Sequence, residues 1–143
     1  MEFYEGLVHS YLTAVRRFLV LPQAEILHNS EGEPWKADVD FVALDFKGEK
    51  IYLVEVSSSS DYPAKAVDRL LEENYKNIEP YIKSELLRNQ LSSFKVIWWF
   101  FIRDRHIPRF QKEACYLAYL KSDGHCEAQS LEQTLDEFKR RLG

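Results

Sequence analysis

The sequence contains little cysteine, glycine or proline. Its 143 residues include two cysteines, five glycines and five prolines. Two cysteines cannot build the disulfide framework of a small secreted protein, and no cysteine and histidine spacing matches a zinc site. Scarce glycine and proline exclude a collagen-like or linker-like chain. We therefore expect a reduced, cytoplasmic protein.

The sequence also lacks a long apolar run. The longest, Val96 to Ile102, has seven residues, whereas a membrane-spanning helix needs about 20. Charged residues interrupt the apolar pattern near the N-terminus, namely Glu2, Glu5, Arg16 and Arg17. That pattern does not match a signal peptide, and we expect no contact with a membrane.

An excess of basic residues is absent as well. Lys and Arg number 19 against 23 Asp and Glu, which gives a formal net charge of −4. This balance excludes a nonspecific polycation. Long contact with a phosphate backbone would need basic surface from a homodimer or a protein partner. Two local basic clusters remain compatible with phosphate contact, Arg103 to Arg109 and Lys139 to Arg141.

The residues that are present describe a soluble globular chain. Hydrophobic residues make up 45% and charged residues 29%, and the length fits a single domain over residues 1–143 with its own core. Helical spacing of apolar residues predicts a helix over residues 3–19, ended by Pro22. Three strands should follow, at residues 24–28, 36–45 and 50–57, the last two joined by a hairpin turn at residues 46–49.

The pattern of apolar residues in the second half of the sequence predicts alternating helices and strands. A helix should begin at Pro63 and continue to residue 91 with a break at Pro80. The expected elements after it are a strand over 94–102, a helix over 107–121, a strand over 126–130 and a helix over 131–142. A hairpin turn at Asp123-Gly124 is the alternative to the end of the helix over 107–121. The resulting order is α-β-β-β-α-β-α-β-α.

The two strands at residues 36–45 and 50–57 carry apolar residues on both faces. In the first of them, Val39, Phe41 and Ala43 should share one face, and Val42 and Leu44 the other. A sheet that is apolar on both faces needs cover on both sides. We therefore predict an α/β fold with a mixed central sheet flanked by helices.

Acidic residues in these two strands are the most informative feature. If the hairpin is centred on Lys47-Gly48, two residues pair when their sequence numbers add up to 95. Asp40 then lies opposite Glu55 and Asp38 opposite Ser57, and all four side chains share one face. Facing carboxylates repel each other. A divalent cation could compensate, one carboxyl group could stay protonated, or the strand end could be solvated with nothing bound.

These residues resemble the PD-(D/E)XK, or restriction-endonuclease-like, nuclease superfamily. The resemblance rests on the segment IYLVEVS at residues 51–57, on the second Asp of ADVDFVAL (residues 37–44), and on the order of elements over about residues 1–102. It implies a restriction-endonuclease-like fold and hydrolysis of phosphodiester bonds in DNA. It further implies Mg²⁺ or Mn²⁺ held by Asp40, Glu55 and the carbonyl of Val56, with Asp38 as an auxiliary ligand and Glu5 as an assisting acid.

The sequence departs from the family at the motif lysine, where Ser57 stands. Serine cannot supply a positive charge. The lysine could have moved, and Lys65 and Lys36 are the candidates. Metal and solvent could suffice without it. Alternatively, the domain could be a catalytically inactive nuclease-fold module that binds nucleic acid or a protein partner.

Overall fold

The computed structural model describes residues 2–30, 33–64, 90–115 and 126–142. Within these ranges, the side chains of residues 22–30, 33–38, 114 and 115 are not described. The predicted helix from Pro63 to residue 91 falls almost entirely outside the described residues. The same holds for residues 116–121 of the predicted helix over 107–121 and for the Asp123-Gly124 turn.

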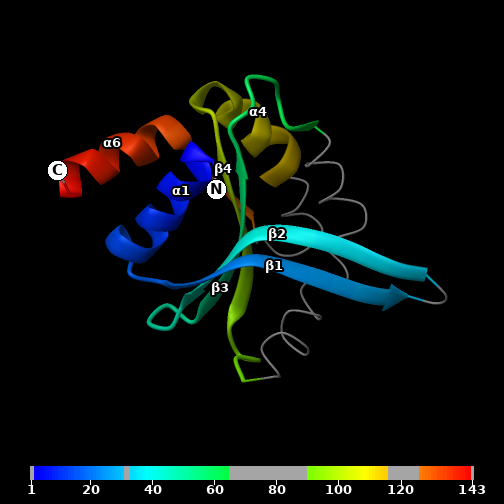
Figure 1. The fold of residues 1–143 in the computed structure, drawn as a ribbon. Coiled ribbons are helices and arrows are strands. Elements are labelled where there is room, and N and C mark those ends of the chain that lie inside the picture. The colour runs from blue at the N-terminus through cyan, green and yellow to red at the C-terminus, as the bar shows by residue number, and fades with distance from the viewer. Residues whose placement is uncertain (1, 31–32, 65–89, 116–125, 143) are drawn as a thin grey trace.

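Five strands form one open mixed sheet in the order β1-β2-β3-β4-β5 (Figure 1). They are β1 (Leu19–Ser30), β2 (Glu33–Asp45), β3 (Lys50–Ser57), β4 (Lys95–Ile102) and β5 (Cys126–Ser130). The pairs β1–β2 and β2–β3 are antiparallel, and β3–β4 and β4–β5 are parallel. The predicted α/β class and mixed sheet are confirmed. β3 and β5 begin and end at the predicted residues.

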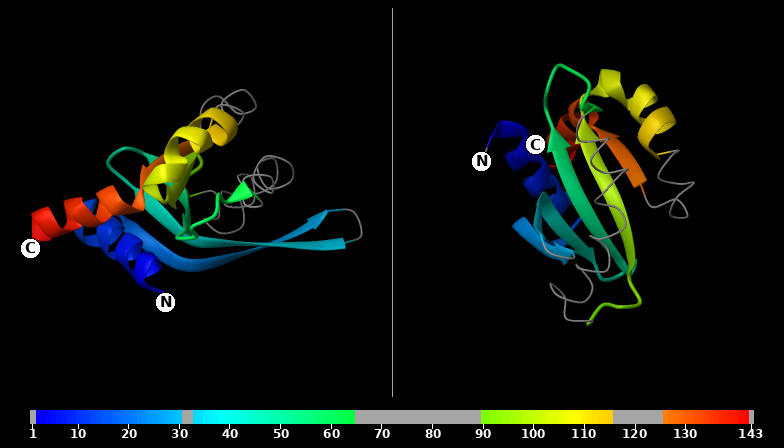
Figure 2. Two further views of the ribbon diagram at one scale, coloured as in Figure 1. Left: turned by 90° about the horizontal axis from the view of Figure 1, so that it is seen from above. Right: turned by 90° about the vertical axis from the view of Figure 1, so that its right-hand side faces the viewer.

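Helices cover both faces of this sheet, as the two-sided apolar strands predict. The helical segments are α1 (Phe3–Ser10), η1 (Tyr11–Val15), η4 (Asp104–His106), α4 (Ile107–Phe110), η5 (Gln111–Cys115) and α6 (Leu131–Leu142). Residues of α1, η1 and α6 pack on one face, which we call the α1 face. Residues of α4 pack on the other, the α4 face. Figure 2 shows α1 and α4 on opposite sides of the strands.

The prediction of one helix over residues 3–19 is wrong at its end. Helical structure stops at Val15, Arg17 adopts a left-handed backbone with φ 58°, and β1 begins at Leu19. Residues 18–21 are an apolar run that suits a strand as well as a helix. Pairing decides between the two, since Leu19 lies opposite Leu44 of β2. Pro22 therefore lies inside β1 and does not end a helix.

The core is split into two layers by the sheet. On the α1 face the buried side chains include Phe41, Ala43, Tyr52, Trp99 and Phe101. On the α4 face they include Val42, Leu44, Ile51, Leu53 and Phe100. This alternation is the predicted one.

Val39 breaks the predicted alternation. We expected it to share a face with Phe41, but it packs with Val42 on the α4 face. The register with β1 is the same on both sides of Asp40, with Pro22 opposite Phe41 and Ala24 opposite Val39, so no inserted residue explains the change of face.

Asp40 also marks the place where β2 leaves β3. The recorded pairs between β2 and β3 run only from Phe41 opposite Val54 to Asp45 opposite Lys50. On its other edge, β2 stays paired with β1 as far as Glu33 opposite Ser30. The far halves of β1 and β2 consequently form a two-stranded arm that extends from the sheet (Figure 1).

Replacing Phe101 tests the α1-face core. Phe101 is fully buried, with its ring centroid 4.8 Å from that of Trp99 and 6.1 Å from that of Tyr11. We expect Phe101→Ala to lower the free energy of unfolding by about 3–5 kcal/mol in urea denaturation, because it removes packing and leaves a cavity. Phe3→Ala is the matched control, since Phe3 is 65% exposed, and it should change stability by less than about 0.5 kcal/mol. Equal losses in both variants would contradict this assignment of the core.

Candidate functional site

The carboxyl ends of three strands meet at one edge of the sheet. β3, β4 and β5 are parallel, and their last residues are register partners, with Ser57 opposite Ile102 and Ile102 opposite Ser130. In open α/β sheets, ligands bind most often outside the carboxyl ends of the strands. The residues that follow these ends, together with Asp40, form the candidate site.

Asp40 makes a specific contact at this edge. Its Oδ2 accepts a hydrogen bond of 2.8 Å from the backbone N–H of Val56. Pairing between β2 and β3 has ended by this point, so the carboxylate takes the place that a backbone carbonyl of β2 would occupy. A carboxylate offers about four acceptor positions, so one N–H bond leaves capacity for other ligands.

Glu55 directly precedes Val56, the donor of this hydrogen bond, in β3. The predicted register is confirmed through Phe41 opposite Val54, and Asp40 and Glu55 are the next residues beyond that pair. Glu55 and Val56 are both partly buried. In a strand the N–H and C=O groups of one residue point to the same neighbouring strand. The Val56 carbonyl therefore points to the side of β3 on which Asp40 lies.

Two protein carboxylates and a carbonyl are oxygen donors of the kind that Mg²⁺ accepts, with water completing its shell. Within the described ranges, however, no three or more His, Cys, Asp or Glu side chains form a group that could hold a metal ion. The side chain of Asp38, the predicted auxiliary ligand, lies outside the described part; its backbone pairs with Glu25 in the arm. Among the predicted ligands, a described contact joins Asp40 to Val56, which follows Glu55 in the chain.

The side chains of the two candidate lysines, Lys65 and Lys36, lie outside the described part of the structure. Lys65 lies outside the described residues, and Lys36 is described by its backbone only, opposite Leu27 in the arm. Ser57, at the motif position, is partly buried beside Ile102. Glu5 is part of the start of α1, where its N–H donates to Glu2 Oε1 over 2.9 Å.

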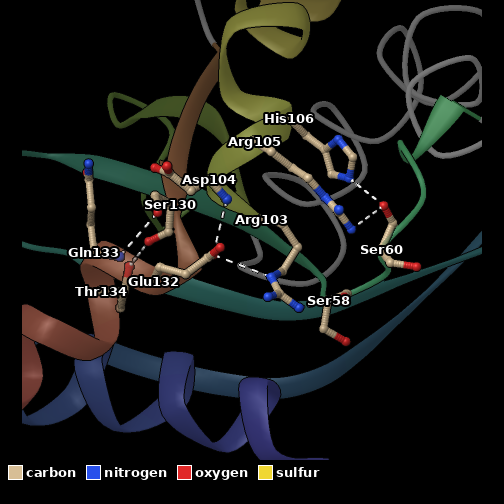
Figure 3. Close-up of polar contacts among 10 residues, drawn as sticks. All are labelled: Ser58, Ser60, Arg103, Asp104, Arg105, His106, Ser130, Glu132, Gln133 and Thr134. Atoms are coloured by element: carbon tan, nitrogen blue, oxygen red, sulfur yellow. Dashed lines mark hydrogen bonds and ion pairs between the residues drawn. The ribbon is translucent and has the colours of Figure 1, made fainter.

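Arginines that follow β4 supply positive charge at the end of β3 (Figure 3). Arg103 Nη1 lies 3.5 Å from the carbonyl oxygen of Ser58, and its guanidinium carbon lies 5.5 Å above the Tyr4 ring. Arg105 Nη2 donates to the Ser60 carbonyl over 2.5 Å. The sequence marks these residues only as a basic cluster. Parallel pairing of β3 with β4 is what brings them to Ser58 and Ser60.

Aromatic contacts hold the same segment from the α4 side. His106 Nε2 lies 3.1 Å from the Ser60 carbonyl oxygen, and its ring meets the Tyr62 ring edge to face at 5.7 Å. The guanidinium carbon of Arg109 lies 3.9 Å from the centroid of that Tyr62 ring. The turn after β3 is therefore anchored to the turn after β4 by cationic and aromatic groups together.

The start of α6 closes the third side of this edge. Ser130 Oγ accepts the N–H of Gln133 over 3.1 Å, which is the N-cap arrangement, and the fully buried Thr134 donates to the Ser130 carbonyl over 2.7 Å. Glu132 Oε1 accepts the N–H of Asp104 over 3.1 Å and lies 3.4 Å from Arg103 Nε. Burial would raise the pKa of Glu132, but the backbone N–H groups and Arg103 outweigh it, and the pKa is lowered.

Comparison with protein-family models, with curated proteins and with solved structures found no match for this chain. No helix among the described residues is both long and apolar enough to cross a membrane. The geometry at the carboxyl edge of the sheet is therefore the main observation that bears on function.

Substitution of Asp40 tests its bond to Val56. Asp40→Ala leaves the Val56 N–H without its acceptor, so we expect the free energy of unfolding to fall by about 1–3 kcal/mol. Asp40→Asn keeps an oxygen acceptor and should retain most of that stability. Urea denaturation of both variants measures the difference. Equal destabilisation by Ala and Asn would show that the negative charge, and not the hydrogen bond, stabilises this position.

The lowered pKa of Glu132 predicts a pH-dependent contribution to stability. Because the pKa is lower in the folded state, the contribution is present above the ordinary value of 4.5 and is lost as pH falls through the folded-state value. Glu132→Gln should be less stable than the wild type by about 0.5–1 kcal/mol near neutral pH, a small value because the side chain is partly exposed. The difference should shrink below the ordinary pKa. A gap that is unchanged in acid would contradict this role.

Proposed function

We propose that this protein is a metal-dependent nuclease, or a nuclease-derived domain, that hydrolyses phosphodiester bonds in DNA. The proposal rests on one observation: the Asp40 carboxylate lies where β2 leaves β3, bonded to the N–H of Val56, one residue after Glu55. The nuclease resemblance implies metal ligands at these same three residues.

The arrangement of elements supports a restriction-endonuclease-like fold. A helix precedes three antiparallel strands, β1 to β3, and β4 then runs parallel to β3. This is the order of elements on which the resemblance rests. Fold similarity alone does not assign a function, so the proposal depends on the residues at the carboxyl edge.

Each residue would have a distinct role in hydrolysis. Asp40, Glu55 and the Val56 carbonyl would hold Mg²⁺ or Mn²⁺, with Asp38 as an auxiliary ligand. A bound cation of this kind supplies Lewis acidity and makes a water molecule easier to deprotonate. The carboxylates would orient that water toward the phosphorus atom, and Asp40 keeps its position through the Val56 N–H.

Positive charge for the phosphate has four candidate sources. Lys36 or Lys65 would replace the motif lysine, which is missing because Ser57 occupies its position. Arg103 and Arg105 are the cations whose side chains reach the segment after β3. A guanidinium pairs well with phosphate oxygens, so these arginines would bind the scissile phosphate or its neighbour.

Ser57 favours the second candidate function, a nuclease-fold module that binds without cutting. A serine at this position provides neither a charge nor a strong base. Such a module would keep the affinity of Arg103 and Arg105 for phosphate and would have no turnover. The two functions differ in whether phosphodiester bonds break.

A cleavage assay separates the two functions. Plasmid and single-stranded DNA are incubated with Mg²⁺, Mn²⁺ or EDTA and the wild type, Asp40→Asn or Glu55→Gln. Both variants remove a charge and keep the side-chain shape, so we expect a loss of cleavage of about 100-fold or more with the fold retained. Asp136→Asn on α6 is the matched control, because Asp136 is an exposed carboxylate away from the carboxyl edge. It should cleave like the wild type.

A further variant, Ser57→Lys, restores the motif lysine. Cleavage that appears only with Ser57→Lys, and that Asp40→Asn then abolishes, would establish the nuclease-derived, inactive module. Cleavage by the wild type that persists in Asp40→Asn and Glu55→Gln would overturn the site. No cleavage by any variant, with no Mg²⁺ or Mn²⁺ binding in calorimetry, would overturn the metal-dependent function.

A further inference from the structure

A pocket lies at the opposite end of the sheet from Asp40. It encloses about 890 Å³ and is lined by Arg16, Arg17, Phe18 and the hairpin segment from Leu44 to Gly48. Asp45 pairs with Lys50 at the start of β3, whereas Glu55 is five residues further along that strand, a distance of about 17 Å at the usual rise. The pocket is therefore separate from the candidate metal site.

Cations dominate this end of the molecule, although the chain has a net charge of −4. Arg16, Arg17 and Lys47 line the pocket and are exposed. Lys50 and Lys95 are register partners beside it. Within the described ranges, Arg16, Arg17 and Lys47 form no ion pair with any carboxylate.

Carboxylates also lie near these cations: Asp45 lines the pocket, and the charges of Glu127 and Asp45 both act on Tyr52, as does that of Arg16. Asp45 Oδ1 accepts the N–H of Gly48 over 2.9 Å inside the hairpin turn. A Cβ at position 48 would meet the Asp45 carboxylate, so a larger residue there would have to displace that side chain. Glu49 is exposed and is not among the residues that line the pocket. Among the residues that line the pocket there are three cations and one carboxylate, that of Asp45, so this lining carries a net positive charge.

Arg16 is held in place by aromatic rings. Its guanidinium carbon lies 5.0 Å from the Phe18 ring and 5.2 Å from the Trp99 ring. Phe18 in turn stacks on Tyr52 at 5.5 Å. A guanidinium that packs against two rings loses less additional freedom when an anion binds than a freely moving one does. The neighbouring Arg17 has a left-handed backbone at φ 58° and an exposed side chain.

An exposed aromatic ring completes the pocket. Phe46 is 56% exposed and lines it, and its ring meets that of Phe94 edge to face at 6.0 Å. The exposed part of the Phe46 ring can contact a planar group. Nucleobases stack on such rings with little dependence on sequence.

We propose that this pocket binds a nucleotide, with the phosphate on Arg16, Arg17 and Lys47 and the base on Phe46. The ligand chemistry is a phosphate next to a planar ring. It could come from a free nucleotide or from the 5′-phosphorylated end of a nucleic acid strand. The inference is independent of the proposed cleavage, because it uses other residues and no metal.

Isothermal titration calorimetry with the full chain in EDTA tests the proposal. The probes are adenosine 5′-monophosphate, inorganic phosphate, and one single-stranded DNA oligonucleotide with either a 5′-phosphate or a 5′-hydroxyl. We expect adenosine 5′-monophosphate to bind more tightly than phosphate. Arg17→Gln and Lys47→Gln should each weaken it by about tenfold, and Phe46→Ala by roughly 5- to 100-fold.

Matched controls keep the test specific. Lys139→Gln removes an exposed cation on α6 and should bind like the wild type, as should Asp40→Asn, which separates this pocket from the metal site. Binding of the 5′-phosphorylated oligonucleotide alone would identify a strand end, and binding of the mononucleotide alone a free nucleotide; both support the proposal. The proposal is overturned if neither binds, if phosphate binds as tightly as the mononucleotide, or if the pocket variants bind like Lys139→Gln.

Discussion

The bond between the Asp40 carboxylate and the N–H of Val56 governs the shape of this protein's carboxyl edge. β2 pairs with two neighbours up to Phe41 and with β1 alone beyond Asp40. Where a strand leaves its neighbour, the neighbour's backbone groups lose their partners, and an unpaired buried N–H is costly. The Asp40 side chain supplies the missing acceptor at 2.8 Å. The arm of β1 and β2 can therefore separate from β3 without leaving that N–H unsatisfied.

Parallel pairing determines what surrounds this point. Because β3, β4 and β5 run in the same direction, the turns after all three open on the same edge. Arg103, Arg105 and His106 meet the carbonyls of Ser58 and Ser60, and Glu132 joins the start of α6 to the N–H of Asp104. Acids from β2 and β3 and cations that follow β4 are thereby brought to one edge. A site that holds a cation and a phosphate needs both kinds of group.

The two ends of the sheet have different chemistry. At the carboxyl edge, carboxylates and arginines lie near one another, and several of the arginines have carboxylate or carbonyl partners. At the hairpin edge, Arg16, Arg17 and Lys47 line a pocket together with one carboxylate, that of Asp45. A net charge of −4 does not reveal this separation. Charge distribution over a folded surface, and not its sum, determines which ligands are attracted.

The sequence by itself determined the elements with strong periodicity or clear boundaries. The strand at Lys50–Ser57, the strand at Cys126–Ser130 and the helix at Leu131–Leu142 agree with their predicted bounds, and the hairpin register follows from its turn. Other features depend on contacts between distant residues. Residues 19–21 are part of a strand because β2 pairs with them, and Val39 packs on the α4 face whereas Phe41 packs on the α1 face. Likewise, Arg103 reached Ser58 only through parallel pairing of strands far apart in the chain. Local sequence patterns encode periodicity and turns. The strand with which a segment pairs, and the face of the sheet on which a side chain lies, depend on contacts between distant residues that no local pattern specifies.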